Sequence, residues 1–280
     1  MIFSYINWNP DPEIVNIFGL SIRYYGLLFV TGLVLSLFVL GRIFKKENIP
    51  SQNLDRLSIY GLIGILAGAR LGHCLFYEPS YFLAHPLEMF LPIRILPEGG
   101  IKFTGYQGMA SHGGGIGLLI ALYFYSRKTK HSMIDTLDLI AVVAGLGSGF
   151  IRLANLMNSE IIGKPSTLAW SFIFERVDMI PRHPAQLYEA ITYFLIFAIM
   201  MTLYRTKREQ FKNGSFFGLV LILIFVARFL IEFLKEDQVG FEEGMQFNMG
   251  QLLSLPYILI GIGFLIYGIN KTKRLATNSG

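Results

Sequence analysis

Long apolar stretches separated by short polar segments dominate the chain. Windows of about 19 apolar residues predict about seven membrane-spanning helices, at roughly 20–41, 57–77, 112–126, 138–158, 187–204, 215–234 and 250–269. The third is short, and its glycine-rich start is expected to lie at the membrane surface or to re-enter the membrane. The predicted fold class is therefore an all-α polytopic membrane protein, with one integral membrane domain over 1–280.

Composition excludes a soluble protein of similar length. Hydrophobic residues make up 53% of the 280 residues and charged residues only 15%, and the mean hydropathy is +0.50. The single cysteine, Cys74, excludes a disulfide framework and a zinc cluster of thiolates, because both need several sulfur atoms. No Lys or Arg precedes the first apolar run, so it lacks the basic region of a cleavable signal peptide and is expected to remain in the mature protein.

The basic residues are distributed unevenly between the two sets of connections. Fourteen of the 24 Lys and Arg residues lie after the first, third and fifth spans and in the C-terminal tail, whereas six lie in the other, longer connections. The positive-inside rule places the N-terminus outside and the C-terminus in the cytoplasm. The net charge of +5 is thus a topology signal, and no basic patch remains to indicate a nucleic-acid partner.

Two long connections, 78–111 and 159–186, are predicted to lie on the extracytoplasmic side as an arm and a small head. The first contains PSYFLAHPLEMFLPIRIL, which has the amphipathic or extended character of an arm at the membrane surface. The second contains AWSFIFERVD, whose apolar and polar residues alternate as in a short strand.

Four arginines lie inside or at the edge of predicted spans: Arg23, Arg70, Arg152 and Arg228. An unpaired arginine at mid-bilayer costs about 2.5–3.5 kcal/mol on insertion scales, so something must compensate these charges. With the predicted orientation, all four lie towards the outer leaflet. Other polar side chains lie at the same depth.

Three of these polar residues, His73, Asn155 and Glu232, lie one helical turn from an arginine and share its helix face. The inner halves of the spans, such as VTGLVLSLFVL, contain no ionisable group, which argues against a pathway across the membrane. Because guanidinium groups bind phosphate oxygens at two points, an anionic phospholipid head group is the natural ligand. The alternative is that internal carboxylates of Glu160, Glu189 and Glu232 hold the arginines, or that the arginines snorkel to the interface.

The glycines of the second and third spans point to different roles. Gly64, Gly68 and Gly72 follow the spacing that lets two membrane helices approach closely, so we expect them to pack. The run from His112 through Gly113 and Gly114 exposes backbone N–H groups beside an imidazole, which suits an anion or ligand site. A flexible re-entrant turn is the alternative.

Searches for other chemistry are negative. The five histidines show no metal-ligand spacing, and no nucleotide-binding or GxSxG context is present, so no metal or cofactor is expected. A rhomboid-like serine protease would need a buried Ser–His pair. Ser111 and His112 are adjacent and would point apart on a helix, and Ser148 is the other conceivable participant, so this class is disfavoured.

The run GFIRLANLMNSEIIGKP, from Gly149 to Pro165, resembles the signature of the prolipoprotein diacylglyceryl transferase family, Gly-Arg-x-Gly-Asn-Phe-x-Asn-x-Glu-x-x-Gly. The polar residues and the last glycine match in register: Arg152, Asn155, Asn158, Glu160 and Gly163. Ile151, Ala154 and Leu156 replace glycine, glycine and phenylalanine of the signature. Further similar segments, which extend the resemblance over nearly the whole chain, are IRYYGLLF, GARLGHCLFY, SHGGGIG, RHPAQLYEA, RFLIEFLKEDQ and MGQLLSLP.

The resemblance implies a seven-helix enzyme of the bacterial cytoplasmic (inner) membrane without a cofactor. It would move the diacylglyceryl group of phosphatidylglycerol onto the lipobox cysteine thiol of a prolipoprotein and release glycerol phosphate. Carried over by position, Arg152 and Arg228 would hold the phosphate, and His112 and Tyr25 would line the reacting centre. The remaining residues implied in substrate binding are Asn155, Glu160, Glu232, Arg70, Gly113 and Gly114.

Two other classes stay open. An anion or lipid transporter would need polar groups through the whole bilayer, and a non-catalytic lipid-binding scaffold would need the arginines but no base. Substitution of His112 would therefore separate an enzyme from a scaffold.

Overall fold

The computed structural model describes residues 5–17, 20–91, 93–96, 99–103, 108–237 and 244–278. Within these ranges, six helices are long and apolar enough to cross a membrane. They are α1 (Tyr24–Lys46), α2 (Ser51–Phe76), α6 (Met133–Met157), α7 (Ala185–Lys207), α8 (Ser215–Glu232) and α9 (Met249–Asn278). The predicted class, a mostly helical membrane protein with several spans, is confirmed.

The seventh expected helix, at 112–126, exists as α5 (Ser111–Thr129), but it is not among the six candidate spans. The first expected span began too early, because Leu20–Arg23 form strand β3 and α1 begins at Tyr24. β3 pairs antiparallel with β2 (Glu13–Ile17), with a register shift between Glu13 and Val15. The apolar residues at 20–23 are thus accounted for by strand pairing rather than by a helix.

The described chain divides into two compact units. Unit 1 comprises Met1–Ile43 and Leu137–Gly280, and unit 2 comprises Phe44–Thr136. Whether the two units form the single domain expected over 1–280 depends on how they assemble, so this expectation stays a prediction.

Unit 1 contains most of α1 and α6, all of α7, α8 and α9, and a small sheet. Neighbouring helices pack through glycines: a Cβ on Gly145 of α6 would lie 2.5 Å from the Tyr193 carbonyl of α7, and one on Gly218 of α8 would lie 2.5 Å from the Gly261 carbonyl of α9. Asp138 of α6 accepts hydrogen bonds from the backbone N–H groups of Gly214 and Phe217, which fixes the start of α8. These contacts fix the relative positions of the helices that carry the polar residues of the candidate site.

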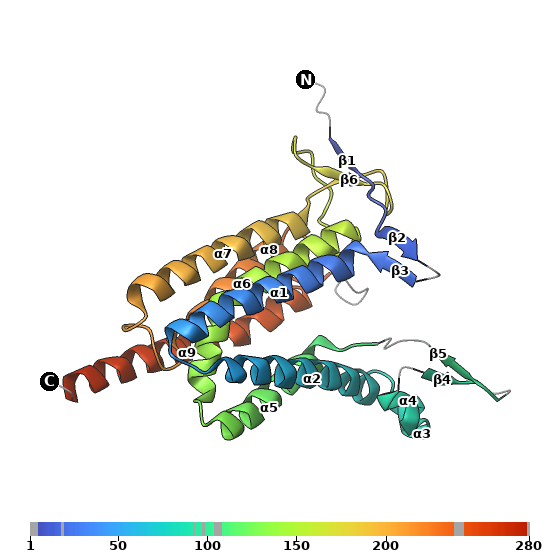
Figure 1. Cartoon of the computed structure of the whole chain (residues 1–280). Helices are drawn as coiled ribbons and strands as arrows, with labels where there is room; N and C mark the ends of the chain where they lie inside the picture. The colour runs from blue at the N-terminus through green and yellow to red at the C-terminus, as the bar shows by residue number, and fades with distance from the viewer. Residues whose placement is uncertain are drawn as a thin grey trace. The chain divides into compact units, whose positions relative to one another are not determined.

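The small sheet of unit 1 has the order β1-β6-β7, with β1 (Ile6–Trp8), β6 (Phe172–Phe174) and β7 (Pro181–Arg182). β1 lies beside β6 and runs parallel to it (Figure 1). β6 in turn runs antiparallel to β7. The predicted strand within AWSFIFERVD is therefore confirmed. Phe172 and Phe174 point into a small core with Leu156, which couples the sheet to the end of α6.

Unit 2 is built on a close pairing of α2 with α5. A Cβ on Gly68 would lie 2.3 Å from the Gly113 carbonyl, and one on Gly117 would lie 2.0 Å from the Gly64 carbonyl, so only glycine fits at this crossing. The expected packing role of Gly64, Gly68 and Gly72 is confirmed. The connection predicted as an arm contains α3 (Pro79–Ala84), α4 (Pro86–Phe90) and the hairpin of β4 (Ile93–Ile95) with β5 (Ile101–Phe103), and its place at the membrane surface stays a prediction.

Candidate functional site

A tight turn follows the C-terminal end of α6 and positions the polar residues of the signature. Ser159 and Ile161 have left-handed backbone conformations, with φ of 54° and 58°. This conformation is rare for a β-branched residue such as Ile161, so tertiary contacts must hold the turn. Such contacts exist, because the Gln186 side chain donates to the Glu160 carbonyl at 2.6 Å and the Gly163 N–H donates to the His183 carbonyl at 3.0 Å.

Arg152, Asn155 and Glu160 form a chain of hydrogen bonds along this end of α6. The Arg152 Nη1 donates to Asn155 Oδ1 at 3.2 Å, and the Asn155 Nδ2 donates to Glu160 Oε1 at 2.7 Å. Asn155 is buried, whereas Glu160 is exposed. The amide of Asn155 thus links a partly buried guanidinium to a carboxylate at the surface.

Glu189 of α7 lies on the other side of Arg152. Its Oε2 is 3.1 Å from the Arg152 Nε, and its side chain is fully buried. The distance defines an ion pair, although the two groups are not aligned for a hydrogen bond. Tyr193, one turn further along α7, donates its hydroxyl proton to Glu189 Oε1 at 3.4 Å. One of the alternatives that the sequence left open, an internal carboxylate for an arginine, is therefore correct for Arg152.

Lys235 lies three residues beyond the end of α8 and connects two buried carboxylates. Its Nζ lies 3.0 Å from Glu189 Oε1 and 3.0 Å from Glu232 Oε2, and its side chain is only 3% exposed. The second oxygen of Glu232 accepts a hydrogen bond from Asn248 Nδ2 at 3.3 Å. A Cβ on Gly250 would lie 2.5 Å from the Glu232 carboxyl carbon, so the start of α9 closes tightly against this carboxylate.

Arg228 has different surroundings from Arg152. It lies near enough to the Tyr193 hydroxyl to interact with it electrostatically. Its Nε is buried, and no atom of the described residues accepts a hydrogen bond from it. Glu232, which shares its helix face, directs its described hydrogen bonds to Lys235 and Asn248. A buried guanidinium N–H without an acceptor is costly, and an anionic ligand would satisfy it.

Tyr25 and Glu160 line one open cavity of about 480 Å³ in unit 1. Its other lining residues are Ser21, Arg23, Gly26 and Asn158. Arg23 is exposed, as expected for an arginine that snorkels, and Tyr25 is partly buried. The cavity joins the start of α1 to the turn after α6, so it adjoins the Arg152–Asn155–Glu160 chain.

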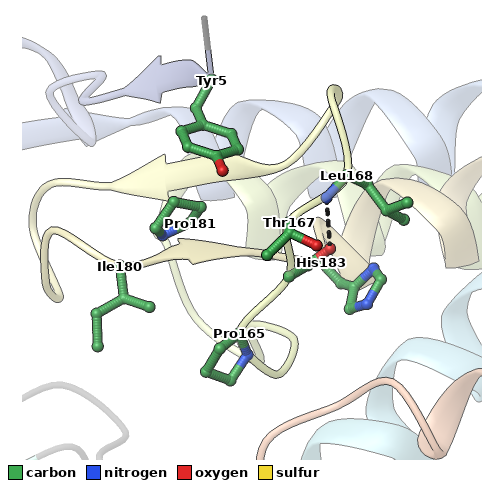
Figure 2. A pocket seen from close by; sticks show the side chains of 8 residues that line it. Tyr5, Pro165, Thr167, Leu168, Ile180, Pro181 and His183 are labelled. Carbon is green, nitrogen blue, oxygen red and sulfur yellow. Dashed lines mark hydrogen bonds between the residues drawn. The ribbon is translucent and has the colours of Figure 1, made fainter. Parts of the chain in front are cut away.

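A second cavity, of about 600 Å³, lies beside the small sheet and is shown in Figure 2. Pro165 and Pro181 face it together with Tyr5 and His183, and the Leu168 N–H donates to the Ser166 hydroxyl at 3.3 Å (Figure 2). Burial lowers the pKa of His183 below its ordinary value, so the imidazole is neutral at pH 7. This cavity contains none of the predicted site residues.

The predicted residues of unit 2 have separate surroundings. Arg70 is buried and donates to the backbone carbonyls of Met89 and Glu88, at 3.2 Å and 2.5 Å, and its guanidinium lies 4.8 Å from the centre of the Phe82 ring. It therefore anchors α4. Although burial raises the pKa of Glu88, hydrogen bonds from the Ile95 N–H and the Tyr81 hydroxyl bring the pKa below its ordinary value.

The glycine run of unit 2 is helical, because α5 begins at Ser111. Gly113 packs against α2, where an added Cβ would lie 2.2 Å from the Gly68 carbonyl, and Gly114 lies in ordinary contact with Ala69. His112 is exposed in the first turn of α5. The close helix crossing gives these glycines a packing role that the sequence analysis assigned only to α2.

The structure thus brings together five predicted residues of unit 1: Arg152, Asn155, Glu160, Arg228 and Glu232. Sequence reasoning missed Lys235 and Asn248 as members, and it named Glu189 only as an alternative partner for arginine. Lys235 lies three residues after Glu232, so its helical spacing to Glu232 was a usable signal. No group of three or more metal-ligand side chains occurs within the described ranges. The cluster combines guanidinium groups, a buried unpaired donor and an adjacent open cavity, which suits the binding of an anion.

Comparison with known proteins extends the resemblance seen in the sequence. The model of the family described as prolipoprotein diacylglyceryl transferase matches residues 12–267. A phosphatidylglycerol–prolipoprotein diacylglyceryl transferase of Bacteroides fragilis is 55% identical over 270 residues, which cover 96% of this chain and 98% of that protein. Proteins of the same name from Chloroherpeton thalassium and Tolumonas auensis are 42% and 41% identical and cover 99% and 95% of this chain. Since the family match and the similar proteins cover nearly its whole length, the chain belongs to the prolipoprotein diacylglyceryl transferase family.

Proposed function

We propose that this protein transfers the diacylglyceryl group of phosphatidylglycerol to the lipobox cysteine thiol of a prolipoprotein. The relatives carry this activity in their names and match at high identity. The observation that carries the proposal is the buried Nε of Arg228, which lacks an acceptor among the described residues and lies in the same cluster as Arg152. A phosphodiester oxygen is an acceptor that fits this donor.

In the proposed reaction, the cysteine sulfur forms a bond to the terminal glycerol carbon of the diacylglyceryl group. The bond between that carbon and the phosphate oxygen breaks, and glycerol 1-phosphate leaves with the thiol proton balancing the charge. Arg152 and Arg228 stabilise the charge that develops on the departing phosphate. Asn155, Glu160 and Glu232 orient these groups, and Tyr25 lines the cavity in which the head group binds.

A base is needed because a free thiol with a pKa near 8.5 is mostly protonated at neutral pH. His112 is assigned this role, since histidine is the side chain that most often acts as a general base and this one is exposed. Arg70, Gly113 and Gly114 enter the proposal as residues that shape unit 2, because their described contacts are to its own backbone and side chains.

The proposed location is the bacterial cytoplasmic membrane, with the N-terminus outside and the C-terminus in the cytoplasm. Maleimide labelling of sealed cells tests the orientation in a variant without Cys74. Asn7→Cys should react from outside, and Lys46→Cys and Lys130→Cys should not. Reaction of both Asn7→Cys and Lys46→Cys would contradict the orientation.

Incubation of the purified protein with phosphatidylglycerol and a lipobox peptide tests the reaction itself. We expect release of glycerol phosphate and a mass increase of the peptide by one diacylglyceryl group. A peptide with serine in place of the lipobox cysteine and a zwitterionic phospholipid are the matched controls. Lipid binding without either product would identify a scaffold instead of an enzyme.

A further inference from the structure

Lys235 is the most deeply buried cation of the cluster in unit 1. Its side chain is 3% exposed, and its ammonium group bridges Glu189 and Glu232 at 3.0 Å each. An ammonium group in such a place is held by its partners, because an unpaired buried charge would be strongly unfavourable. The resemblance to the family assigned no role to this lysine.

The two carboxylates of Lys235 are also the carboxylates nearest to the arginines. Glu189 forms the ion pair with Arg152, and Glu232 shares the helix face of Arg228. Without Lys235, two arginines would stand against two buried carboxylates, and the positive charge of the cluster would be cancelled. With Lys235, three cations stand against the two buried carboxylates of Glu189 and Glu232, which leaves a net charge of +1 among these five groups; the carboxylate of Glu160, linked to Arg152 through Asn155, is exposed at the surface and is not counted.

The described hydrogen bonds agree with this division of charge. Lys235 and Asn248 each donate to a different oxygen of Glu232, so both oxygens already have a donor. Lys235 likewise occupies Oε1 of Glu189, whereas the other oxygen approaches Arg152 without an aligned hydrogen bond. The Nε of Arg228 has no acceptor among the described residues. The carboxylates are thus directed to Lys235, and guanidinium donors remain available.

We propose that Lys235 is a positioning residue that neutralises Glu189 and Glu232, so that Arg152 and Arg228 keep their positive charge for the phosphate of an anionic lipid. The inference rests on the proposed function for the identity of that lipid. It adds that the affinity for the lipid depends on the net charge of this buried cluster.

Four variants separate charge from packing. Lys235→Met removes the charge and keeps an unbranched apolar side chain, and Lys235→Arg keeps the charge. Lys235→Met combined with Glu232→Gln restores the net charge of +1 while removing more of the native bonds. Lys164→Met is the control, because Lys164 is an exposed lysine whose backbone N–H bonds to the Leu234 carbonyl.

Two quantities are measured: the half-saturating concentration of phosphatidylglycerol for transfer, and its retention by the protein in mixed micelles of uncharged detergent. We expect Lys235→Met to raise the half-saturating concentration by about tenfold or more, as for the loss of one buried charge partner. Lys235→Arg and Lys164→Met should stay within about threefold of the unmodified protein, a difference of less than 1 kcal/mol. The double variant should have a lower half-saturating concentration than Lys235→Met, because it regains the net positive charge.

The double variant decides between the two roles, because a lysine needed only for packing would not be rescued by removing a second partner. Failure of rescue in a double variant with a normal melting temperature would overturn the proposal, as would a Lys235→Met protein with unchanged lipid binding. If Lys235→Met fails to fold, Lys235→Gln, which removes the charge but keeps a polar side chain, replaces it in both measurements and should weaken lipid retention in the same direction. Absence of transfer by the unmodified protein would refute the proposed function, while the lipid-retention measurement would still judge Lys235.

Discussion

Two regions of the molecule contain buried arginines, and they use them differently. In unit 2, Arg70 donates to the carbonyls of Glu88 and Met89 and stacks over Phe82, so its hydrogen bonds serve the attachment of α4. In unit 1, Arg152 shares a carboxylate with a lysine, and the Nε of Arg228 has no described acceptor. A buried arginine is therefore not by itself a sign of ligand binding. What distinguishes Arg70 from Arg228 is whether the described residues supply acceptors for the guanidinium donors.

The largest expected effect comes from the one residue of unit 2 to which we assign chemistry. His112→Gln should lower turnover by a factor of about 10²–10⁴ if general-base catalysis is lost. Raising the pH from about 6 to 9 should partly rescue the variant, because the substrate thiol then ionises without a base. Turnover over this pH range, measured beside a melting curve, tests the prediction. If the activity fell in parallel with the melting temperature, His112 would have a structural role and would not be the base.

Arginine-to-lysine substitutions test the comparison directly. Arg152→Lys and Arg228→Lys should each reduce transfer by a factor of about ten or more, because an ammonium group cannot make a planar two-point contact with phosphate. Arg70→Lys should instead lower the melting temperature and leave the activity of the folded protein largely intact. Exposed Arg23 is the control, and Arg23→Lys should have little effect on either quantity. Normal transfer by both site variants would refute bidentate phosphate recognition.

The structural role of unit 2 predicts a loss of stability when its helix crossing is opened. Gly68→Ala places a Cβ 2.3 Å from the Gly113 carbonyl, and such overpacking costs about 1–3 kcal/mol. Gly115→Ala is the matched control, because nothing lies within 4 Å of the added Cβ and alanine favours a helix by about 1 kcal/mol. Thermal unfolding in detergent should show a lower melting temperature for Gly68→Ala and not for Gly115→Ala. Equal melting temperatures would mean that the crossing tolerates a separation of the helices.

Sequence reasoning reached those features that depend on local spacing. The apolar windows predicted the long helices, the four-residue glycine spacing predicted the packing of α2, and the i,i+3 spacing predicted contact between Arg152 and Asn155. These features follow from helix geometry, which is the same wherever the helix lies. The arginines to which we assign phosphate binding could therefore be named from the sequence, whereas their partners could not.

The partners were less predictable, because they come from distant parts of the chain. Glu189 and Lys235 lie 46 residues apart, and Arg70 is 18 residues from the carbonyl of Glu88. Such contacts depend on how the helices pack, and the hydrophobic pattern does not specify this. The start of α1 was placed too early for a similar reason, since the pairing of β3 with β2 competes with the apolar signal at 20–23.

The smallest expected effect is a change in acid stability at the sheet of unit 1, where an arginine forms ion pairs with two carboxylates of the protein. Arg182 donates to both oxygens of Asp178, with its Nη2 at 2.6 Å from Oδ2, and its Nη1 lies 2.6 Å from Glu236 Oε2. Hydrogen bonding from Arg182 holds the pKa of Asp178 below its ordinary value. A carboxylate with a lowered pKa stabilises the folded state above its unfolded pKa of about 4, and this stability is lost as the pH falls through the folded pKa.

Thermal unfolding between about pH 6 and pH 3 should therefore show a modest extra loss of stability below about pH 4 in the unmodified protein. Asp178→Asn should be less stable at pH 6 and should lack this part of the acid-dependent loss, because its side chain does not titrate. Transfer activity at neutral pH should change little in this variant, since Asp178 lies outside the cluster around Arg228. A marked loss of transfer at unchanged stability would mean that the sheet takes part in substrate binding. The presence or absence of protein acceptors around an arginine would then not indicate whether that arginine binds substrate.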